Sequence, residues 1–149
     1  MGIVWVGSPT HANDRHRSCP LSEWRPVLQT PNFTFYSLQK DGQSRGLAEL
    51  PDEVTLRDLD PLLEDYGDLA ILIDQLDLVI SVDTSVAHVA GALSKPVWTL
   101  LSYVPDWRWL LEGETTPWYP TMRLFRQTQP GEWAGVIRQV AAVLQAELG

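Results

Sequence analysis

The chain has 149 residues, of which 44% are hydrophobic, so its length suits one domain over residues 1–149 and its composition argues against disorder. Its formal net charge of −8 disfavours a nucleic-acid-binding protein, because such proteins are usually basic. The single cysteine, Cys19, excludes an internal disulfide and a Cys-rich zinc site, and it favours a cytoplasmic location. We expect no membrane span, because the apolar runs are far shorter than the roughly 20 residues required, and no signal peptide at the N-terminus.

The first half of the chain alternates short apolar runs with loops. In chain order it predicts a strand over residues 3–6, a polar loop over 10–18, a helix over 20–28, a strand over 33–38, a loop over 40–52 with room for a short helical turn, and a brief strand over 54–56. Pro20 suits a first helical turn, whereas Pro26 lies inside the helical pattern. We therefore expect the helix over 20–28 to be short or kinked.

The second half of the chain shows clearer periodicity. It predicts a helix over residues 68–75, a strand over 78–82, a helix over 85–93, a strand over 95–101, an irregular segment over 103–120, a short strand over 123–125 and an amphipathic helix over 133–148. Strands that alternate with helices imply crossover connections and a parallel sheet covered on both faces. The predicted fold class is therefore α/β with three layers.

The sharpest motif is Asp83-Thr-Ser-Val-Ala-His88, which follows a predicted buried strand and opens the next helix. Ligands of open α/β sheets bind at the carboxyl ends of strands, and a helix N-terminus there attracts phosphate through its free N–H groups and dipole. Thr84 and Ser85 add hydroxyl donors, and helical spacing turns His88 the same way. The alternative is that Asp83 and Ser85 only cap the helix and that His88 is a hydrogen-bonded core residue.

The loop after the first predicted strand is a second candidate for phosphate binding. Gly7 permits close backbone approach, Ser8 offers a hydroxyl donor, and Arg15 and Arg17 can each place two N–H groups on phosphate oxygens. The loop lacks the glycine-rich signatures of nucleotide-binding loops. The alternative is a solvated loop whose arginines pair with nearby acidic residues.

Two further polar residues are predicted near this edge of the sheet. Gln39 follows the strand predicted over residues 33–38 and could bind a base edge or a ribose, although a turn without a ligand is an equal alternative. Asp65 precedes a predicted helix, where a carboxylate could hold a ribose hydroxyl as it does in dinucleotide-binding folds. Asp65 or Asp68 could instead be the N-cap of that helix.

The segment Pro105-Asp-Trp-Arg-Trp109 combines aromatic and charged side chains. Asp106 and Trp107 suit sugar recognition, because an indole stacks on the apolar face of a sugar while a carboxylate accepts from its hydroxyls. The alternative is a loop anchored to the core by large aromatics, which Trp109 favours. Asp58-Leu-Asp60 matches a pattern that holds metals in some glycosyltransferases, but we predict a turn before Pro61 there and no metal or other cofactor.

These motifs together resemble one known family. The stretch over residues 76–98, which includes Asp83-Thr-Ser-Val-Ala-His88, is similar to the C-terminal, donor-binding domain of heptosyltransferases. It is closer still to related domains that follow tetratricopeptide repeats in some bacterial proteins. Residues 13–20, Ser37-Leu-Gln39 and Pro105-Asp-Trp-Arg-Trp109 also resemble those domains, so the resemblance covers nearly the whole chain.

The resemblance implies the C-terminal half of a GT-B glycosyltransferase, in which two Rossmann-like domains enclose the active site and a nucleotide-sugar is the donor. By the same resemblance, Thr84 and Ser85 would hold the diphosphate and Asp83 a sugar hydroxyl. Arg17 would neutralise phosphate charge, and Gln39 would lie near the ribose or base. Such enzymes typically need no metal, because cations and the helix dipole stabilise the leaving diphosphate.

The chain departs from a complete enzyme of that family. It begins directly before the first strand of the donor domain, so we expect the acceptor domain and its catalytic base to be missing, and Ser85 replaces a common glycine. We therefore expect a nucleotide-sugar-binding domain that needs an acceptor domain, a tetratricopeptide-repeat partner or a homo-oligomer for transfer. The alternative is a non-catalytic regulatory or interaction module that keeps the fold.

Overall fold

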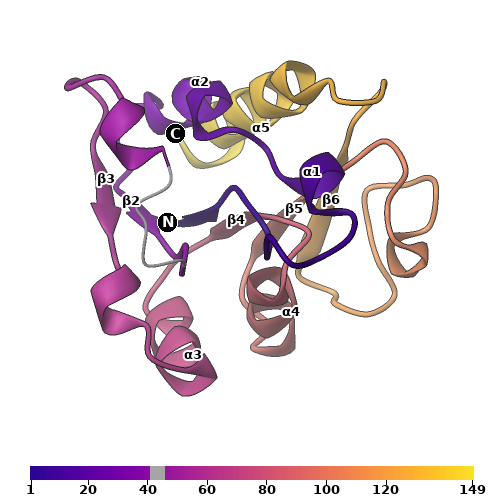
Figure 1. Ribbon diagram of the computed structural model, residues 1–149, viewed down its shortest axis with the longest axis horizontal. Helices are drawn as coiled ribbons and strands as arrows, with labels where there is room; N and C mark the ends of the chain where they lie inside the picture. The colour runs from indigo at the N-terminus through magenta and orange to yellow at the C-terminus, as the bar shows by residue number, and fades with distance from the viewer. Residues whose placement is uncertain (41–45) are drawn as a thin grey trace.

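Short strands, which are mostly apolar at the centre of the sheet and more polar at its edges, form a parallel sheet. The computed structural model describes residues 1–40 and 46–149. In it the six strands are β1 (Gly2–Val4), β2 (Phe35–Ser37), β3 (Leu56–Asp58), β4 (Val79–Val82), β5 (Val97–Leu101) and β6 (Met122–Arg126). They lie in the order β3-β2-β1-β4-β5-β6, and every neighbouring pair is parallel (Figure 1). The order reverses between β1 and β4, and this point of an open sheet is where ligands bind.

Two layers of helices cover the sheet. One face carries α2 (Arg25–Leu28) and the long α5 (Trp133–Leu148), and the other carries α3 (Tyr66–Asp74) and α4 (Ser85–Ala92), as Figure 1 shows. Shorter helical turns are α1 (Asp14–Arg17), η1 (Leu21–Trp24), η2 (Leu47–Glu49), η3 (Asp60–Leu62) and η4 (Trp107–Trp109). The predicted three-layer α/β, Rossmann-like fold is therefore confirmed.

The two cores follow from the alternation of side chains along each strand. Ile80 and Val82 of β4 face the core beneath α2 and α5, whereas Val79 of the same strand faces the core beneath α3 and α4. In β1, Ile3 faces the core beneath α2 and α5, and Val4 faces the core beneath α3 and α4. Successive strand residues point to opposite faces, so a central strand covered on both faces must be apolar throughout.

Several predicted elements need correction in position. The helix expected over residues 20–28 divides into η1 and α2, and Pro26 occupies the first turn of α2, where no N–H is needed. The strand expected over 54–56 lies at Leu56–Asp58 instead, because Val54 is buried outside the ladder. The polar loop over 10–18 contains α1. The loop over 40–52 contains η2, and part of that loop lies outside the described residues.

Candidate functional site

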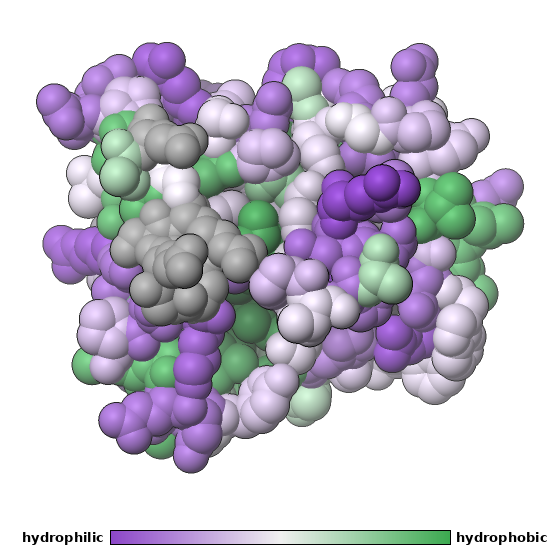
Figure 2. All heavy atoms as spheres, viewed as in Figure 1, coloured by the Kyte–Doolittle hydropathy of each residue, from purple (hydrophilic) through white to green (hydrophobic). Residues whose placement is uncertain are grey.

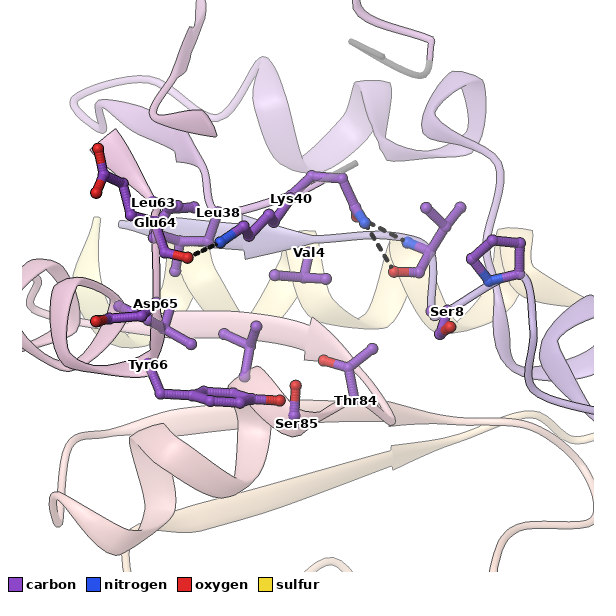
Figure 3. Close-up of a pocket in the computed structure, with 16 residues that line it drawn as sticks. Val4, Ser8, Leu38, Lys40, Leu63, Glu64, Asp65, Tyr66, Thr84 and Ser85 are labelled. Carbon is purple, nitrogen blue, oxygen red and sulfur yellow. Dashed lines mark hydrogen bonds between the residues drawn. The ribbon is translucent and has the colours of Figure 1, made fainter. Parts of the chain in front are cut away.

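A pocket of about 540 Å³ opens where the strand order reverses, at the carboxyl ends of β1, β2 and β4 (Figure 3). We call it the switch-point pocket. Four chain segments border it: residues 6–9 after β1, residues 38–40 after β2, residues 63–66 at the start of α3, and residues 84–86 at the start of α4. Because the strands are parallel, loops far apart in sequence reach the same edge of the sheet.

The switch-point pocket has a mixed lining of apolar and polar side chains. Its apolar lining comes from strand β1, from helices α3 and α4 and from the loops before and after them, and includes Val4, Val6, Leu38, Leu63, Leu69 and Val86. Its polar lining comprises Ser8, Gln39, Lys40, Glu64, Asp65, Thr84 and Ser85. Such a combination suits a ligand with one flat apolar part and one strongly polar part.

The N-terminus of α4 faces this pocket without a side-chain cap. Thr84 holds the N-cap position in an extended conformation, and among the described residues no side chain accepts from the first amides of α4. The Thr84 hydroxyl instead shares a hydrogen bond of 3.0 Å with the hydroxyl of Ser81. Ser85 is exposed at the mouth of the pocket. The first amides of a helix lack partners within the helix, so here they remain available to an anion.

The other two long helices are capped in the usual way, which makes the bare end of α4 distinctive. Asp65 caps α3 by accepting from the amides of Gly67 and Asp68 at 2.7 and 3.0 Å. Glu132 caps α5 by accepting from the amide of Gly135 at 2.6 Å. The alternative in which Asp65 is an N-cap is therefore observed, and one carboxylate oxygen of Asp65 carries that role at the edge of the pocket.

Arg17 lies directly behind the pocket wall. Its guanidinium donates to the backbone oxygen of Asp83 at 3.0 Å and lies 3.7 Å from the carboxylate of Asp14. A Cβ at Gly7 would meet this guanidinium at 2.7 Å, so the glycine is what allows the close approach. The side chain is 15% exposed. Arg17 thus brings positive charge to the junction between the β1 loop and the start of α4.

Of the two remaining residues predicted to bind phosphate, one lines the switch-point pocket and the other does not. Ser8 lines the pocket, and its hydroxyl shares a hydrogen bond of 2.8 Å with that of Thr10. Arg15 lies elsewhere: it lines a separate hollow with Glu23 and Trp133, and its Nε donates to the ring of His16 at 3.0 Å. The structure therefore brings Ser8, but not Arg15, to the switch-point pocket.

Gln39 lines the pocket but is occupied by the protein itself. Its Oε1 accepts from the amide of Val6 at 3.2 Å, and its Nε2 donates to the carbonyl of Val6 at 3.1 Å. The buried side chain therefore pairs with the backbone after β1 as a neighbouring strand would. Here Gln39 joins the loops that follow β1 and β2, which gives the pocket wall its shape.

A second group of side chains centres on His88 of α4 and lies outside the lining of the switch-point pocket. We call it the His88 cluster: Asp83, His88, Asp106, Trp107, Arg108, Trp109 and Tyr119. The His88 ring stacks on Trp109 with centroids 5.2 Å apart, and its Nδ1 shares a hydrogen bond of 2.9 Å with the Tyr119 hydroxyl. Partial burial lowers the pKa of His88, and the positive charge of Arg108 acts in the same direction. The carboxylates of Asp83 and Asp106 oppose that shift.

Asp106 and Trp107 occupy the exposed end of the His88 cluster. The Asp106 carboxylate caps η4 and accepts from Nε of Arg108 at 2.8 Å, and these hydrogen bonds lower its pKa. Trp107 is 75% exposed and meets Trp118 edge to face, with centroids 6.5 Å apart. The predicted sugar-binding pair therefore lies in the segment that contacts His88 of α4, with Trp109 buried as the core anchor of that segment and stacked on His88.

Two tyrosines that were not assigned as site residues from the sequence lie at the site. Tyr66, the residue after Asp65, is 65% exposed and lines the switch-point pocket, where Figure 3 shows its hydroxyl pointing toward Ser85. The sequence signal that could have identified Tyr66 is its position in the first turn of a helix at the carboxyl edge of the sheet. Tyr119 reaches His88 from a segment without regular structure, so no sequence periodicity marks it. Lys40 donates to the backbone oxygen of Glu64 across the pocket mouth.

No group of three or more potential metal-binding side chains occurs within residues 1–40 and 46–149. At the candidate metal pattern, the Asp58 carboxylate accepts from the amide of Asp60 at 3.1 Å, ahead of the turn at Pro61. This is the turn expected from the sequence. In the same described residues, no helix combines the length and apolarity needed to cross a membrane.

Comparisons with known proteins bear on the same region. Residues 65–118, which contain α3, β4, α4, β5 and most of the His88 cluster, match the family of glycosyltransferase family 9 (heptosyltransferase). The chain is also 30% identical over 149 residues to Protein FlbA of Caulobacter vibrioides, an alignment that covers 97% of this chain and 25% of that protein. The chain thus spans about a quarter of the length of this relative. No solved structure matches the chain.

Proposed function

We propose that this heptosyltransferase-like chain binds the nucleotide-sugar donor of a glycosyl transfer, and that transfer requires an acceptor domain or partner. The observation that carries the proposal is the uncapped N-terminus of α4, which faces a pocket at the reversal point of a parallel sheet. A pyrophosphate satisfies both the free amides and the positive end of the helix dipole. The family match over residues 65–118 supports the same assignment.

The shape of the site suggests how the donor lies. The nucleoside enters the apolar part of the switch-point pocket, near Leu63 and Tyr66. The diphosphate lies over the first turn of α4, within reach of Thr84 and Ser85. The sugar then extends toward the His88 cluster, where Asp106 and Trp107 provide a carboxylate and an exposed indole.

The direct test is calorimetric titration of the 149-residue chain with UDP-, ADP- and GDP-sugars. We expect at least one of the three to bind with an affinity that its uncharged free sugar does not match. We expect the same affinity in EDTA and in excess Mg²⁺, because the α4 amides and Arg17 supply the positive charge in place of a metal. Failure of all three nucleotide-sugars to bind would refute the proposal.

A negative charge introduced at the first residue of α4 tests the proposed diphosphate position most directly. Ser85→Asp places a carboxylate where the diphosphate is proposed to lie, and we expect nucleotide affinity to fall by more than tenfold, which is about 1.4 kcal/mol. The variant should keep its stability, because an acidic residue favours a helix N-terminus. Gln139→Glu on the exposed side of α5 makes the same change in net charge and should leave binding unchanged. Equal losses in both variants would mean that only overall charge matters.

An exposed apolar surface favours a second candidate function, an interaction or regulatory module. Trp107, Leu110, Leu111 and Trp118 of the segment between β5 and β6 are all more than half exposed. Figure 2 shows hydrophobic residues at the right edge of this face, where Figure 1 places this segment, and others over its left half. Surfaces of this kind often bind other proteins. Transfer or hydrolysis of a nucleotide-sugar that is lost in Asp83→Ala would rule out a non-catalytic role.

A further inference from the structure

The contact between Tyr119 and His88 is built from two elements that are distant in sequence. Gly91 lies one turn after His88 on α4, and a Cβ at that position would meet the Tyr119 ring at 2.5 Å. The ring therefore lies directly against the helix backbone, which only glycine permits. This packing fixes the phenol so that its hydroxyl reaches Nδ1 of His88 at 2.9 Å.

One face of the His88 ring is covered as well. The indole of Trp109, which is fully buried, stacks on the imidazole at an interplanar angle of 25°. Arg126 holds the segment that carries this indole, since its guanidinium donates to the backbone oxygens of Trp109 and Leu110. The imidazole is thus held by an indole on one face and by the Tyr119 hydroxyl at Nδ1, and both contacts restrict its rotation.

One edge of the ring remains open. Nδ1 and Nε2 lie on different edges of an imidazole, so a bond at Nδ1 leaves Nε2 directed away from Tyr119. Within residues 1–40 and 46–149, Nε2 has no hydrogen-bond partner. The charged groups that act on this ring are Asp83 and Asp106, which are negative, and Arg108, which is positive.

The chemistry of the two partners favours one tautomer. A phenol hydroxyl is a good donor, and the bare nitrogen of a neutral imidazole is a good acceptor. When the hydroxyl donates to Nδ1, the ring proton must reside on Nε2. Burial favours the neutral ring over the imidazolium, so this choice of tautomer applies near neutral pH.

We propose that Tyr119 is a positioning residue that holds His88 with its proton on Nε2, so that His88 donates this N–H to an oxygen of the donor's sugar-phosphate. The proposal rests on the proposed nucleotide-sugar site, because His88 lies one helical turn beyond Ser85 at the N-terminus of α4. Without the Tyr119 hydroxyl, the ring proton divides between the two nitrogens. Part of the protein then presents a bare nitrogen, which repels an anionic oxygen.

The test combines ring-nitrogen NMR with binding. Long-range ¹H–¹⁵N spectra of the ¹⁵N-labelled 149-residue chain report which nitrogen of each histidine carries the proton. His88→Gln identifies the His88 signals among those of His11 and His16, which are both exposed. We expect protonated Nε2 and bare Nδ1 in the wild type, and a mixture of tautomers in Tyr119→Phe, which keeps the ring against Gly91.

Calorimetry with UDP, ADP and GDP supplies the second readout. We expect Tyr119→Phe to weaken the tightest of the three by roughly 2- to 10-fold, the effect of losing one neutral hydrogen bond. Tyr36→Phe removes a hydroxyl from a half-buried tyrosine beside the opposite, amino edge of the sheet and should change nothing. Thermal denaturation should show the two variants to be similarly stable.

Each result decides a separate point. A proton on Nδ1 in the wild type would overturn the proposed orientation. The expected tautomer with unchanged affinity in Tyr119→Phe would overturn the link to the ligand. Absence of binding by the wild type to any of the three nucleotides would refute the proposed function instead, while the NMR signals would still decide the tautomer.

Discussion

At the scale of single residues, the site depends on which polar atoms the protein has already used. Gln39 and Asp65 look equally suited to a nucleoside in the sequence, yet both carry protein-to-protein hydrogen bonds at the pocket wall. The first amides of α4 are not capped by a side chain in the described part of the chain. A ligand therefore gains most where the protein leaves donors open, because unmet buried donors are costly.

Arg17 tests whether charge behind the pocket wall contributes to binding. We expect Arg17→Ala to weaken nucleoside diphosphate binding about tenfold, or ~1.4 kcal/mol, near the lower end for a charge-assisted bond, because the guanidinium lies behind Gly7. Arg17→Lys keeps the charge and should recover part of the loss. Calorimetry should show no change for an uncharged sugar. A similar loss for charged and uncharged ligands would indicate damage to the loop instead of lost charge.

At the scale of elements, α4 combines the phosphate-binding end with a packing surface for Tyr119. Gly91 is an unfavourable residue in a helix interior, where alanine is better by about 1 kcal/mol. Its presence is explained by the Tyr119 ring, which occupies the space that a Cβ would need. Gly91 therefore lowers the intrinsic stability of α4, but it makes room for the ring of Tyr119 from the segment after η4.

We expect Gly91→Ala to destabilise the fold by about 1–3 kcal/mol, the range typical of overpacking, despite the gain in helix propensity. Urea denaturation followed by tryptophan fluorescence measures the free energy of unfolding. Gly67→Ala is a matched control in the exposed first turn of α3, where the new Cβ lies 3.0 Å from the Asp65 side chain. That control should be neutral or slightly stabilising. A Gly91→Ala variant as stable as the wild type would show that the Tyr119 ring has room to move.

The elements that the sequence predicts best are those whose signal is local. Helix α5 matches its predicted bounds, because sixteen residues of amphipathic pattern leave little choice. Strand β3 was misplaced, since it is a partly exposed edge strand without an apolar run, whereas the neighbouring Val54 is buried outside the sheet. Helix α1 spans four polar residues and has no periodicity to detect.

The residues of the candidate site show the same contrast between features with a local sequence signal and features that depend on the fold. Thr84 and Ser85 were predicted, because a strand followed by small polar residues and a helix places them at the binding edge. The hydrogen bonds between Gln39 and Val6 were not predicted, because they depend on β1 and β2 being neighbours in the sheet. Tyr119 lies 31 residues from His88, and only the folded path of the segment between β5 and β6 brings them together.

At the scale of the whole molecule, the order of the sheet is what makes one site from many loops. The chain adds β2 and β3 on one side of β1 and then returns to add β4, β5 and β6 on the other. The loops after β1 and β4 diverge at that reversal, and the switch-point pocket lies between them. The overall charge of −8 opposes anion binding at long range, so the affinity must come from the local arrangement of α4 and Arg17.

The most direct test of the central claim is a ¹H–¹⁵N NMR titration of the 149-residue chain with inorganic pyrophosphate and with UDP, ADP and GDP. The account predicts that the largest amide shifts occur at Ser85 and Val86 with pyrophosphate, and extend to Ser8, Lys40 and Tyr66 when a nucleoside is attached. Gly135, at the capped N-terminus of α5, should not shift. Shifts confined to the hollow at the amino edge of the sheet, around Phe33 and Asp77, or unchanged amides at the start of α4, would contradict it.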